Sequence, residues 1–337
     1  MTVNTAMIKE LNKKLVRDWL IKVREATIYE LSQVTGLSVV TVKSLLVELI
    51  EMGEVREGET VPSNGGRPST LYIYNKDYRH ALVVYGCQKN DSNLIHIRVA
   101  NLFEECVYHD EVLIEDVQVS SFCGYIDKAI EAYPNIAVIG FGLPGVEEEG
   151  IIISNDYCGV VGDAFMAYYK RRYDLPVVFL NDVNAAVKGY YSSHADDSAC
   201  LVGIYFPRIY PPGAGMVMNQ EIYMGAHHFA GEIGHLLPGV DWTQLDYADD
   251  LAVTEATAAL LAIYCRIVAP NQFILYGDFF SDAKARTIQL QTQRLLSERY
   301  LVNVSVSADF EKDFERGMIV AVLEQIMKNI SKDGFYI

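Results

Sequence analysis

The stretch Ala226-His-His-Phe-Ala-Gly-Glu-Ile-Gly-His-Leu-Leu-Pro-Gly239 gathers one acid, three histidines and three glycines into fourteen residues, which is too polar and irregular for a core element. Glu232 and His235 are three residues apart, so a helical turn would place both on one face. Gly231 and Gly234 would let the backbone approach a small ligand. The stretch is therefore either a polar surface turn or part of a binding site, and motifs elsewhere in the chain favour the binding site.

The composition is that of a globular protein with more than one domain. A chain of 337 residues exceeds one ordinary core, so two or three domains are expected. Half of the residues are hydrophobic, yet no apolar run approaches the roughly 18 residues of a membrane span. Residues 1–20 mix Lys and Asp with apolar side chains, which argues against a secretory signal and for a cytoplasmic protein. The six cysteines are scattered without a CxxC pair, so we expect buried thiols.

The net charge of −16 is distributed unevenly. Residues 1–75 hold nine Lys or Arg and nine Asp or Glu residues, so residues 76–337 carry the whole negative excess. A neutral head can contact DNA while an acidic body is repelled by phosphate. For the body, surface charge that only aids solubility is the alternative explanation.

Residues 6–23 form the first predicted helix of the head. Their apolar residues recur at intervals of three and four, which indicates one buried stripe. The stripe consists of Ile8, Leu11, Leu15 and Trp19 together with Val16, Leu20 and Val23.

Two capping signals follow this helix. Thr27 with Glu30 fits a capping box at the start of a short helix that ends at Gly36. Its buried face is predicted to contain Ile28, Leu31 and Val34. Ser38 would cap a third helix that ends near Gly53. The inward side chains of this third helix are predicted to be Val42, Leu45, Leu46 and Leu49. Two helices joined by such a short, glycine-containing turn have the spacing of a helix-turn-helix.

The third helix and the segment after it supply the expected DNA contacts. Ser38, Thr41, Lys43 and Ser44 lie in the N-terminal half of that helix, where they can reach phosphates or base edges. Residues 55–74 are predicted to form two strands around a polar tip, and Arg67 at this tip can enter a narrow minor groove. The pattern favours a winged helix, and a three-helix bundle that contacts other proteins is the alternative.

Residues 81–337 alternate predicted strands and helices, which is typical of a layered α/β fold. Polar residues follow the buried strands, at the sheet edge where such folds bind ligands. One such strand, 177–180, runs directly into Asn181 and Asp182. Asp182 is either the N-cap of the next helix or a general base that accepts a proton from a bound hydroxyl, with Asn181 orienting the substrate.

These motifs together resemble those of the ROK family of repressors and sugar kinases, over nearly the whole chain. The matching segments are Gly65-Gly-Arg-Pro-Ser69, Gly140-Phe-Gly-Leu-Pro-Gly145, Pro176, Asn181-Asp-Val-Asn-Ala-Ala186, Gly213-Ala-Gly215, Gly225, Ala230-Gly-Glu-Ile-Gly-His235 and Ala269-Pro-Asn-Gln-Phe-Ile-Leu-Tyr-Gly277. The resemblance implies a two-lobed, actin-like ATPase fold of the ribonuclease H type, with sugar in the cleft. Asn181, Asp182, Glu232 and His235 fall on the family's sugar-contacting positions, Asp182 also on the kinase base, and His235 on a position used for sugar or zinc.

The chain departs from the family's kinases where they hold ATP. Kinases carry Asp-x-Gly-Gly-Thr after the first strand, whereas this chain has Tyr85-Gly-Cys-Gln-Lys-Asn-Asp91. Before Gly213, the family's Gly-Thr-Gly becomes Ile209-Tyr-Pro-Pro212, and proline removes a backbone donor. A phosphate cradle needs glycines and a charge or metal. We therefore expect no kinase activity and no catalytic use of Asp182.

The family's cysteine-rich zinc segment after His235 is also missing, because residues 236–264 contain no cysteine. His235 alone cannot form a tetrahedral structural site, so we expect no metal and no cofactor. The acidic residues Asp246, Asp249 and Asp250 are interpreted as a solvated loop.

Two parts are predicted: a winged helix-turn-helix domain at 1–75 and a two-lobed, ROK-type sugar-binding domain at 76–337. The resemblance implies a sugar-responsive regulator of carbohydrate genes, more specifically a repressor, that binds operator DNA as a homodimer or a dimer of dimers. Two alternatives stay open. One is an ATP-dependent sugar kinase, and the other is a regulator whose ROK domain only dimerises.

Overall fold

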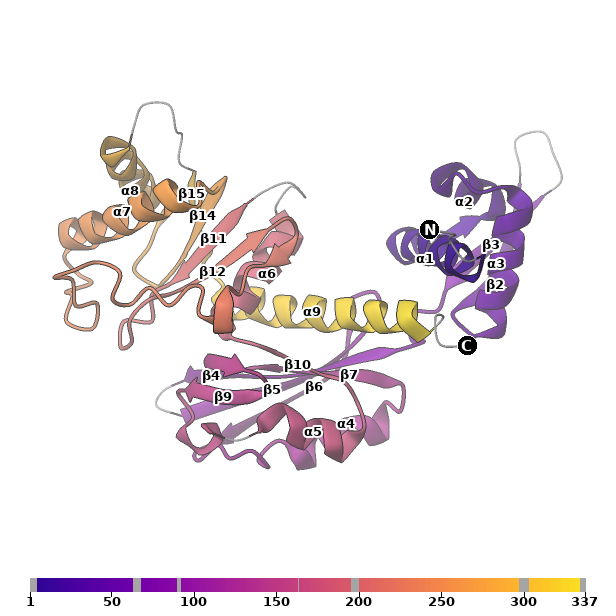
Figure 1. Ribbon diagram of the computed structural model, residues 1–337, viewed down its shortest axis with the longest axis horizontal. Helices are drawn as coiled ribbons and strands as arrows, with labels where there is room; N and C mark the ends of the chain where they lie inside the picture. Colours follow the sequence, from indigo (N-terminus) through magenta and orange to yellow (C-terminus); the bar gives the residue numbers. More distant parts are fainter. Residues whose placement is uncertain are drawn as a thin grey trace.

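The computed structural model describes residues 5–62, 68–89, 92–162, 164–194, 200–296 and 303–333. These residues form a small N-terminal unit and two larger lobes, each lobe built on its own β-sheet (Figure 1). The long C-terminal helix runs from between the lobes toward the N-terminal unit.

The N-terminal unit is a winged helix. Three helices pack beside an antiparallel sheet of order β1-β3-β2. The elements are α1 (Thr5–Val23), β1 (Glu25–Thr27), α2 (Ile28–Thr35), α3 (Val39–Glu51), β2 (Val55–Val61) and β3 (Ser69–Tyr74). Thr27 and Glu30 form the predicted capping box, since each side chain accepts the other residue's amide. Ser38 caps α3 by accepting the Thr41 amide, which confirms that prediction as well.

The buried face of α1 contains only part of the predicted stripe. Ile8, Leu11 and Leu15 are between 46% and 49% exposed, whereas Val16 and Leu20 are fully buried. The apolar residues of α1 cover two adjacent faces, and the face that turns inward also carries buried cations, among them Arg17. On α2, Val34 is likewise exposed, while the four inward residues predicted for α3 are all buried.

A buried ion pair joins α1 to the sheet of the winged helix. Arg17 donates from Nε to Oε2 of Glu54 at 2.6 Å and from Nη2 to Oε1 at 2.9 Å. Tyr74 on β3 donates its hydroxyl to the same carboxylate at 3.2 Å. Both charged side chains are almost fully buried, so the pair satisfies charges that could not remain unpaired in this core.

The first lobe is a five-stranded sheet of order β10-β7-β4-β5-β6. The strands β4, β5 and β6 are antiparallel neighbours, and β7 and β10 run parallel to β4. Its elements are β4 (His80–Lys89), β5 (Ser92–Asn101), β6 (Cys106–Ile114), α4 (Cys123–Ala132), β7 (Ile136–Gly142), α5 (Phe165–Tyr173) and β10 (Val177–Leu180), with a hairpin of β8 (Gly145–Glu148) and β9 (Ile151–Asn155) and a short turn, η1 (Cys158–Val160). Alternate side chains of β4 join different cores, with Leu82 on the side of α4 and α5 and Val83 on the opposite side.

The second lobe repeats this topology. Its sheet has the order β13-β12-β11-β14-β15. Taken from β15 to β13, the strand directions match those of the first lobe from β10 to β6. The elements are β11 (Leu201–Tyr205), β12 (Gly213–Met218), β13 (Glu221–Ile222), η2 (Ala226–His228), α7 (Asp250–Ile267), β14 (Gln272–Tyr276), α8 (Asp282–Leu295) and β15 (Val304–Val306). The two lobes are thus structural duplicates of each other, although their sequences show no obvious repeat.

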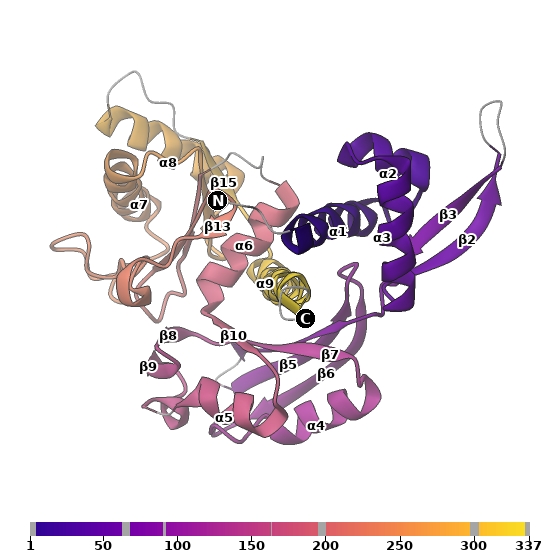
Figure 2. The same cartoon turned by 45° about the vertical axis from the view of Figure 1, so that its right-hand side comes forward.

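Two helices cross between the lobes. α6 (Asp182–His194) follows the first sheet but packs on β11 and β12, and α9 (Phe310–Asp333) follows the second sheet but packs on β4 and β7. The two helices also pack on each other, and Figure 2 shows α9 between α6 and the first sheet. The lobes are therefore joined through this helix pair.

The chain reverses between β12 and β13, because Asn219 and Gln220 both adopt positive φ. One interpretation from the sequence needs correction. The acidic run is not wholly a loop, since Asp249 accepts two backbone amides as the N-cap of α7 and Asp250 lies in its first turn. An acid there stabilises the exposed amides and the dipole of the helix N-terminus.

None of the described helices is by itself long and apolar enough to cross a membrane. The helices α2 and α3 meet that criterion only when they are joined, and they are bent by 113° relative to each other.

Candidate functional site

A cavity of about 730 Å³ lies between the lobes. Asn181, Asp182, Glu232 and His235 all line it, so the structure brings together the four residues that the sequence places at a sugar site. The first lobe adds Pro144, Gly145, Ser154 and Asp156, and the second lobe adds Gly213 and Phe229. Carboxylates, an amide and an imidazole at the rim, with proline and aromatic side chains in the walls, suit a polar ligand that also has an apolar face.

Asn181, and not Asp182, caps the helix α6. Its Oδ1 atom accepts the Asn184 amide at 2.8 Å, and α6 begins at the next residue. Asp182 is therefore the first residue of the helix and not its N-cap, although its Oδ1 atom accepts the Val183 amide at 2.9 Å. The Asp182 carboxylate faces the cavity, where burial raises its pKa to about 6.

The stretch from 226 to 239 forms turns, so Glu232 and His235 are not presented by a helix. Glu232 forms an isolated bridge with Gly213, and Ala214 donates its amide to the carbonyl of Gly231 at 2.9 Å. Gly231 has a φ of 103°, and a Cβ there would lie 1.9 Å from the Ala214 oxygen. Only glycine fits this close approach, and the bridge fixes Glu232 at the edge of the cavity.

The lobes also touch beside the cavity, next to its lining residues Val146 and Phe229. His227 pairs through Nδ1 with the carboxylate of Glu148, and His228 Nδ1 lies 2.6 Å from the carbonyl oxygen of Glu147. The two acids belong to β8 of the first lobe and the histidines to η2 of the second. Sequence reasoning missed these contacts, because the acids and the histidines are about eighty residues apart.

A second cavity of about 320 Å³ adjoins the first and shares Asp156, Asp182 and Tyr205 with it. It extends to Gly86 and Cys87, on the strand after which the family's kinases carry their phosphate loop. Proline and large apolar side chains from other segments line it, namely Pro144, Pro207, Ile209, Tyr210, Phe310 and Phe314. Tyr205 and Phe310 stack with ring centroids 4.1 Å apart. The prolines in these walls have no backbone N–H to donate to a polyphosphate.

An aromatic cluster holds the region where the family carries zinc. Trp242 is 1% exposed and packs edge to face on Phe206, with ring centroids 5.4 Å apart. Tyr247 donates its hydroxyl to the Trp242 carbonyl at 3.0 Å and contacts Phe279. The donor set for a zinc ion at His235 does not fit, since residues 236–264 provide no thiolate.

The winged helix exposes most of the residues predicted to contact DNA. Lys43 and Ser44 are exposed on α3, while Ser38 and Thr41 share a hydrogen bond of 2.8 Å at its N-terminus. Arg67 lies outside the described residues. Val40 is 79% exposed beside them, and sequence reasoning did not select it because it looked for polar contacts. A valine so exposed at the start of a recognition helix is suited to contact thymine methyl groups.

Comparison with known proteins agrees with this architecture of a winged helix on a two-lobed, actin-like body. Residues 111–247 match the model of the ROK family, so the chain contains a ROK family domain. The xylose repressor of Caldicellulosiruptor bescii is 26% identical over 264 residues, which cover 74% of this chain and 62% of that protein. The match thus spans about three fifths of the length of these curated xylose repressors.

Solved structures show the same fold. A ROK family transcriptional regulator, described as a homologue of the Escherichia coli MLC protein, matches 96% of this chain with a TM-score of 0.72 and 16% identity. The ROK hexokinase of Thermus thermophilus matches 74% of this chain with a TM-score of 0.61 and 15% identity. The match to the regulator structure therefore includes a further 22% of this chain's residues (96% against 74%) compared with the match to the kinase structure.

Proposed function

We propose that this protein is a sugar-responsive transcriptional repressor. The observation that carries the proposal is the combination of an N-terminal winged helix with a two-lobed body whose cleft keeps the sugar-side residues and has proline and aromatic side chains in the walls on the phosphate side. The relatives named xylose repressor support D-xylose as the first effector to test. In this proposal the protein is cytoplasmic and binds operator DNA as a dimer.

Each of the four cleft residues has a role in hydrogen bonding to sugar hydroxyls. The carboxylates of Asp182 and Glu232 accept, and His235 donates or accepts according to its tautomer. Asn181 uses its Oδ1 atom to cap α6, which leaves its amide nitrogen as a donor. Asp182 then positions a sugar hydroxyl and does not act as the general base of a phosphoryl transfer.

In this proposal, sugar binding in the cleft changes the relative arrangement of the two lobes, and this change alters the position of the winged helix. The winged helix contacts the first lobe, since the Arg24 guanidinium lies 5.1 Å from the centroid of the Phe103 ring. Lys76, in the segment that follows the winged helix, accepts the Leu102 amide at 2.9 Å. A sugar that binds one lobe arrangement more tightly shifts the population toward it. In a dimer, this shift changes the spacing of the two recognition helices and lowers the affinity for the operator.

Fluorescence anisotropy with a labelled duplex from the region upstream of the protein's own gene tests DNA binding. We expect specific binding that weakens as salt rises, because Lys and Arg side chains release counterions from the phosphates. Binding no tighter than to an unrelated duplex of equal length would refute the DNA-binding part of the proposal.

A sugar kinase is the second candidate, and Asp182 favours it. This carboxylate faces the cleft at the family's base position, with its pKa raised to about 6, which suits a general base. A coupled assay of ATP turnover with D-xylose, D-glucose and N-acetyl-D-glucosamine separates the two candidates. Sugar-dependent turnover that is lost in Asp182→Asn would establish the kinase, and its absence supports the repressor.

A further inference from the structure

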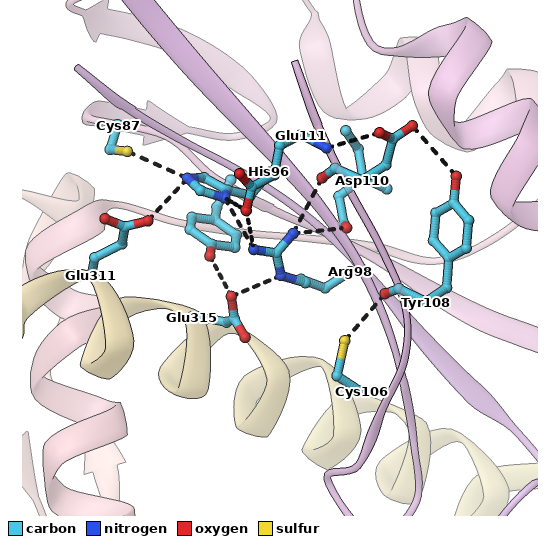
Figure 3. A network of polar contacts seen from close by, with 11 residues as sticks. Cys87, His96, Arg98, Cys106, Tyr108, Asp110, Glu111, Glu311 and Glu315 are labelled. Carbon is cyan, nitrogen blue, oxygen red and sulfur yellow. Dashed lines mark hydrogen bonds and ion pairs between the residues drawn. The ribbon is translucent and has the colours of Figure 1, made fainter. Parts of the chain in front are cut away.

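We propose that Cys87, His96 and Glu311 bind a divalent transition-metal ion of the zinc class. This site is separate from the family's zinc segment and lies where β4, β5 and the start of α9 meet (Figure 3). The inference stands apart from the proposed repressor function, since it concerns the occupancy of a second site.

The alternation of the strands brings the three side chains to one face. Tyr85 and His96 pair across β4 and β5, and their rings stack 4.5 Å apart. Cys87 is two residues beyond Tyr85, so its side chain lies on the same face of the sheet. That face is covered by α9, and Glu311 lies in the first turn of this helix. The ligands therefore come from three elements that the core holds in place.

The distances fit a tetrahedral ion. Zinc bonds of about 2.3 Å to sulfur and about 2.0 Å to nitrogen or oxygen imply edges of about 3.6 Å between sulfur and nitrogen and about 3.3 Å between nitrogen and oxygen. The corresponding distances are 3.5 Å from Cys87 Sγ to His96 Nε2 and 3.1 Å from that nitrogen to Glu311 Oε1. All three ligand atoms lie within 4.8 Å of one another.

The other side of the imidazole supports this arrangement. Glu111 Oε1 lies 3.1 Å from Nδ1 of His96 and also accepts Nη2 of Arg98 at 2.8 Å. Nη2 of Arg98 also lies 3.1 Å from Nδ1 of His96. In the tautomer that binds metal, Nδ1 carries the proton and donates it to Glu111, and the lone pair of Nε2 is directed toward Cys87 and Glu311. Histidines that bind metals carry this kind of carboxylate partner on their second nitrogen.

The local charge favours a divalent cation. Glu111, Glu311 and Glu315 surround the site, and Arg98 is the cation that pairs with two of them. With a neutral histidine and a thiol the group has a net charge of −2. Metal binding releases the thiol proton of Cys87 to solvent, so an added dication and the resulting thiolate bring the net charge to −1.

One of the three ligands, Cys87, opens onto the smaller cavity. Cys87 lines this cavity together with Tyr157, whose side chain is 95% buried and whose hydroxyl has no hydrogen-bond partner among the described residues. A buried hydroxyl without a partner is costly, and a water or an oxyanion on the metal would satisfy it. Three protein ligands with one open position form an exchangeable site.

The test uses the full chain, stripped of metal by chelation and titrated with Co²⁺, whose spectrum reports thiolate ligation. We expect one equivalent to give a thiolate-to-cobalt charge-transfer band and tetrahedral visible bands, and Zn²⁺ to displace both. Cys87→Ser should abolish the charge-transfer band. Glu111→Gln, which neutralises the carboxylate that contacts Nδ1 of His96 and Nη2 of Arg98, should weaken binding by about 10- to 100-fold.

Cys106→Ser is the matched control, because this exposed thiol on β6 donates to the Tyr108 carbonyl outside the metal-ligand group. It should keep the full spectrum. Glu311→Gln, on a side chain that is 51% exposed, tests the site with little risk to folding and should shift the visible bands and weaken binding. A wild-type chain without the thiolate band, or a band that survives Cys87→Ser, would overturn the proposal and leave a hydrogen-bonded triad.

Discussion

Gly189 of α6 and Gly317 of α9 meet where the two helices cross. A Cβ on Gly189 would lie 2.7 Å from the Gly317 amide nitrogen and 1.9 Å from the Asp313 carbonyl oxygen. A Cβ on Gly317 would lie 1.7 Å from the Ala185 oxygen. The backbones of the two helices that join the lobes are therefore in direct contact, and no larger residue fits between them.

Gly189→Ala and Gly317→Ala should each destabilise the body by about 2 to 3 kcal/mol, because the added methyl group has no space. Gly124→Ala is the matched control, since Gly124 is also helical and a Cβ there meets nothing within 4 Å. It should be neutral or stabilise by up to about 1 kcal/mol. Scanning calorimetry of the three variants checks this. Equal midpoints for Gly189→Ala and Gly124→Ala would contradict the close crossing.

Breaking the pair between Arg17 and Glu54 should unfold the winged helix at lower temperature. Glu54→Gln leaves a buried guanidinium without its counter-charge, and the cost of such a loss is about 3 to 5 kcal/mol. The double variant Arg17→Met with Glu54→Leu should lose less stability than Arg17→Met alone or Glu54→Leu alone, because no charge remains buried. Circular dichroism melts give the comparison. A double variant less stable than both single ones would show that the pair itself stabilises the fold.

Asp182 makes the stability of the protein depend on pH in a defined direction. Its pKa is raised from 3.8 to about 6, so its protonated form is favoured by folding. This contribution to stability is complete below pH 3.8 and is lost as the pH rises through 6. Asp182→Asn should therefore be more stable than wild type by on the order of 1 to 2 kcal/mol at pH 7.5, where solvent in the cleft reduces the full effect. Denaturant melts at pH 7.5 and 5 should show this difference shrinking at the lower pH. A constant difference would contradict the raised pKa.

Lys43 and Val40 should affect DNA binding in different ways. Lys43→Ala removes one phosphate contact, so affinity falls for all sequences and the log–log salt slope drops by about 1. Val40→Ala removes an apolar contact to base edges and should relax sequence preference with the salt slope unchanged. Lys128→Ala on α4, an exposed lysine of the first lobe, is the control and should leave both quantities unchanged. Binding curves for specific and unrelated duplexes at several salt concentrations decide between these outcomes.

The sequence predicted much of this architecture because local signals were strong. Capping residues marked α2 and α3, and polar residues after buried strands marked the cleft. The resemblance implied two lobes, but their shared topology was not visible in the sequence, since matching strand orders leave no common sequence pattern. The predicted stripe of α1 was only partly right, because periodicity alone could not choose between two adjacent apolar faces. The roles of Asn181 and Asp182 depended on which of two neighbouring polar side chains reaches the Asn184 amide, and only coordinates decide that.

The central claim is that sugar in the cleft controls the affinity for DNA. The most direct measurement is the operator dissociation constant of the full chain by anisotropy, with and without saturating D-xylose, D-glucose or N-acetyl-D-glucosamine. We predict that one sugar weakens operator binding by about 5- to 150-fold. Glu232→Ala should keep the sugar-free affinity and lose this response. An operator affinity that no sugar in the panel changes would contradict the account.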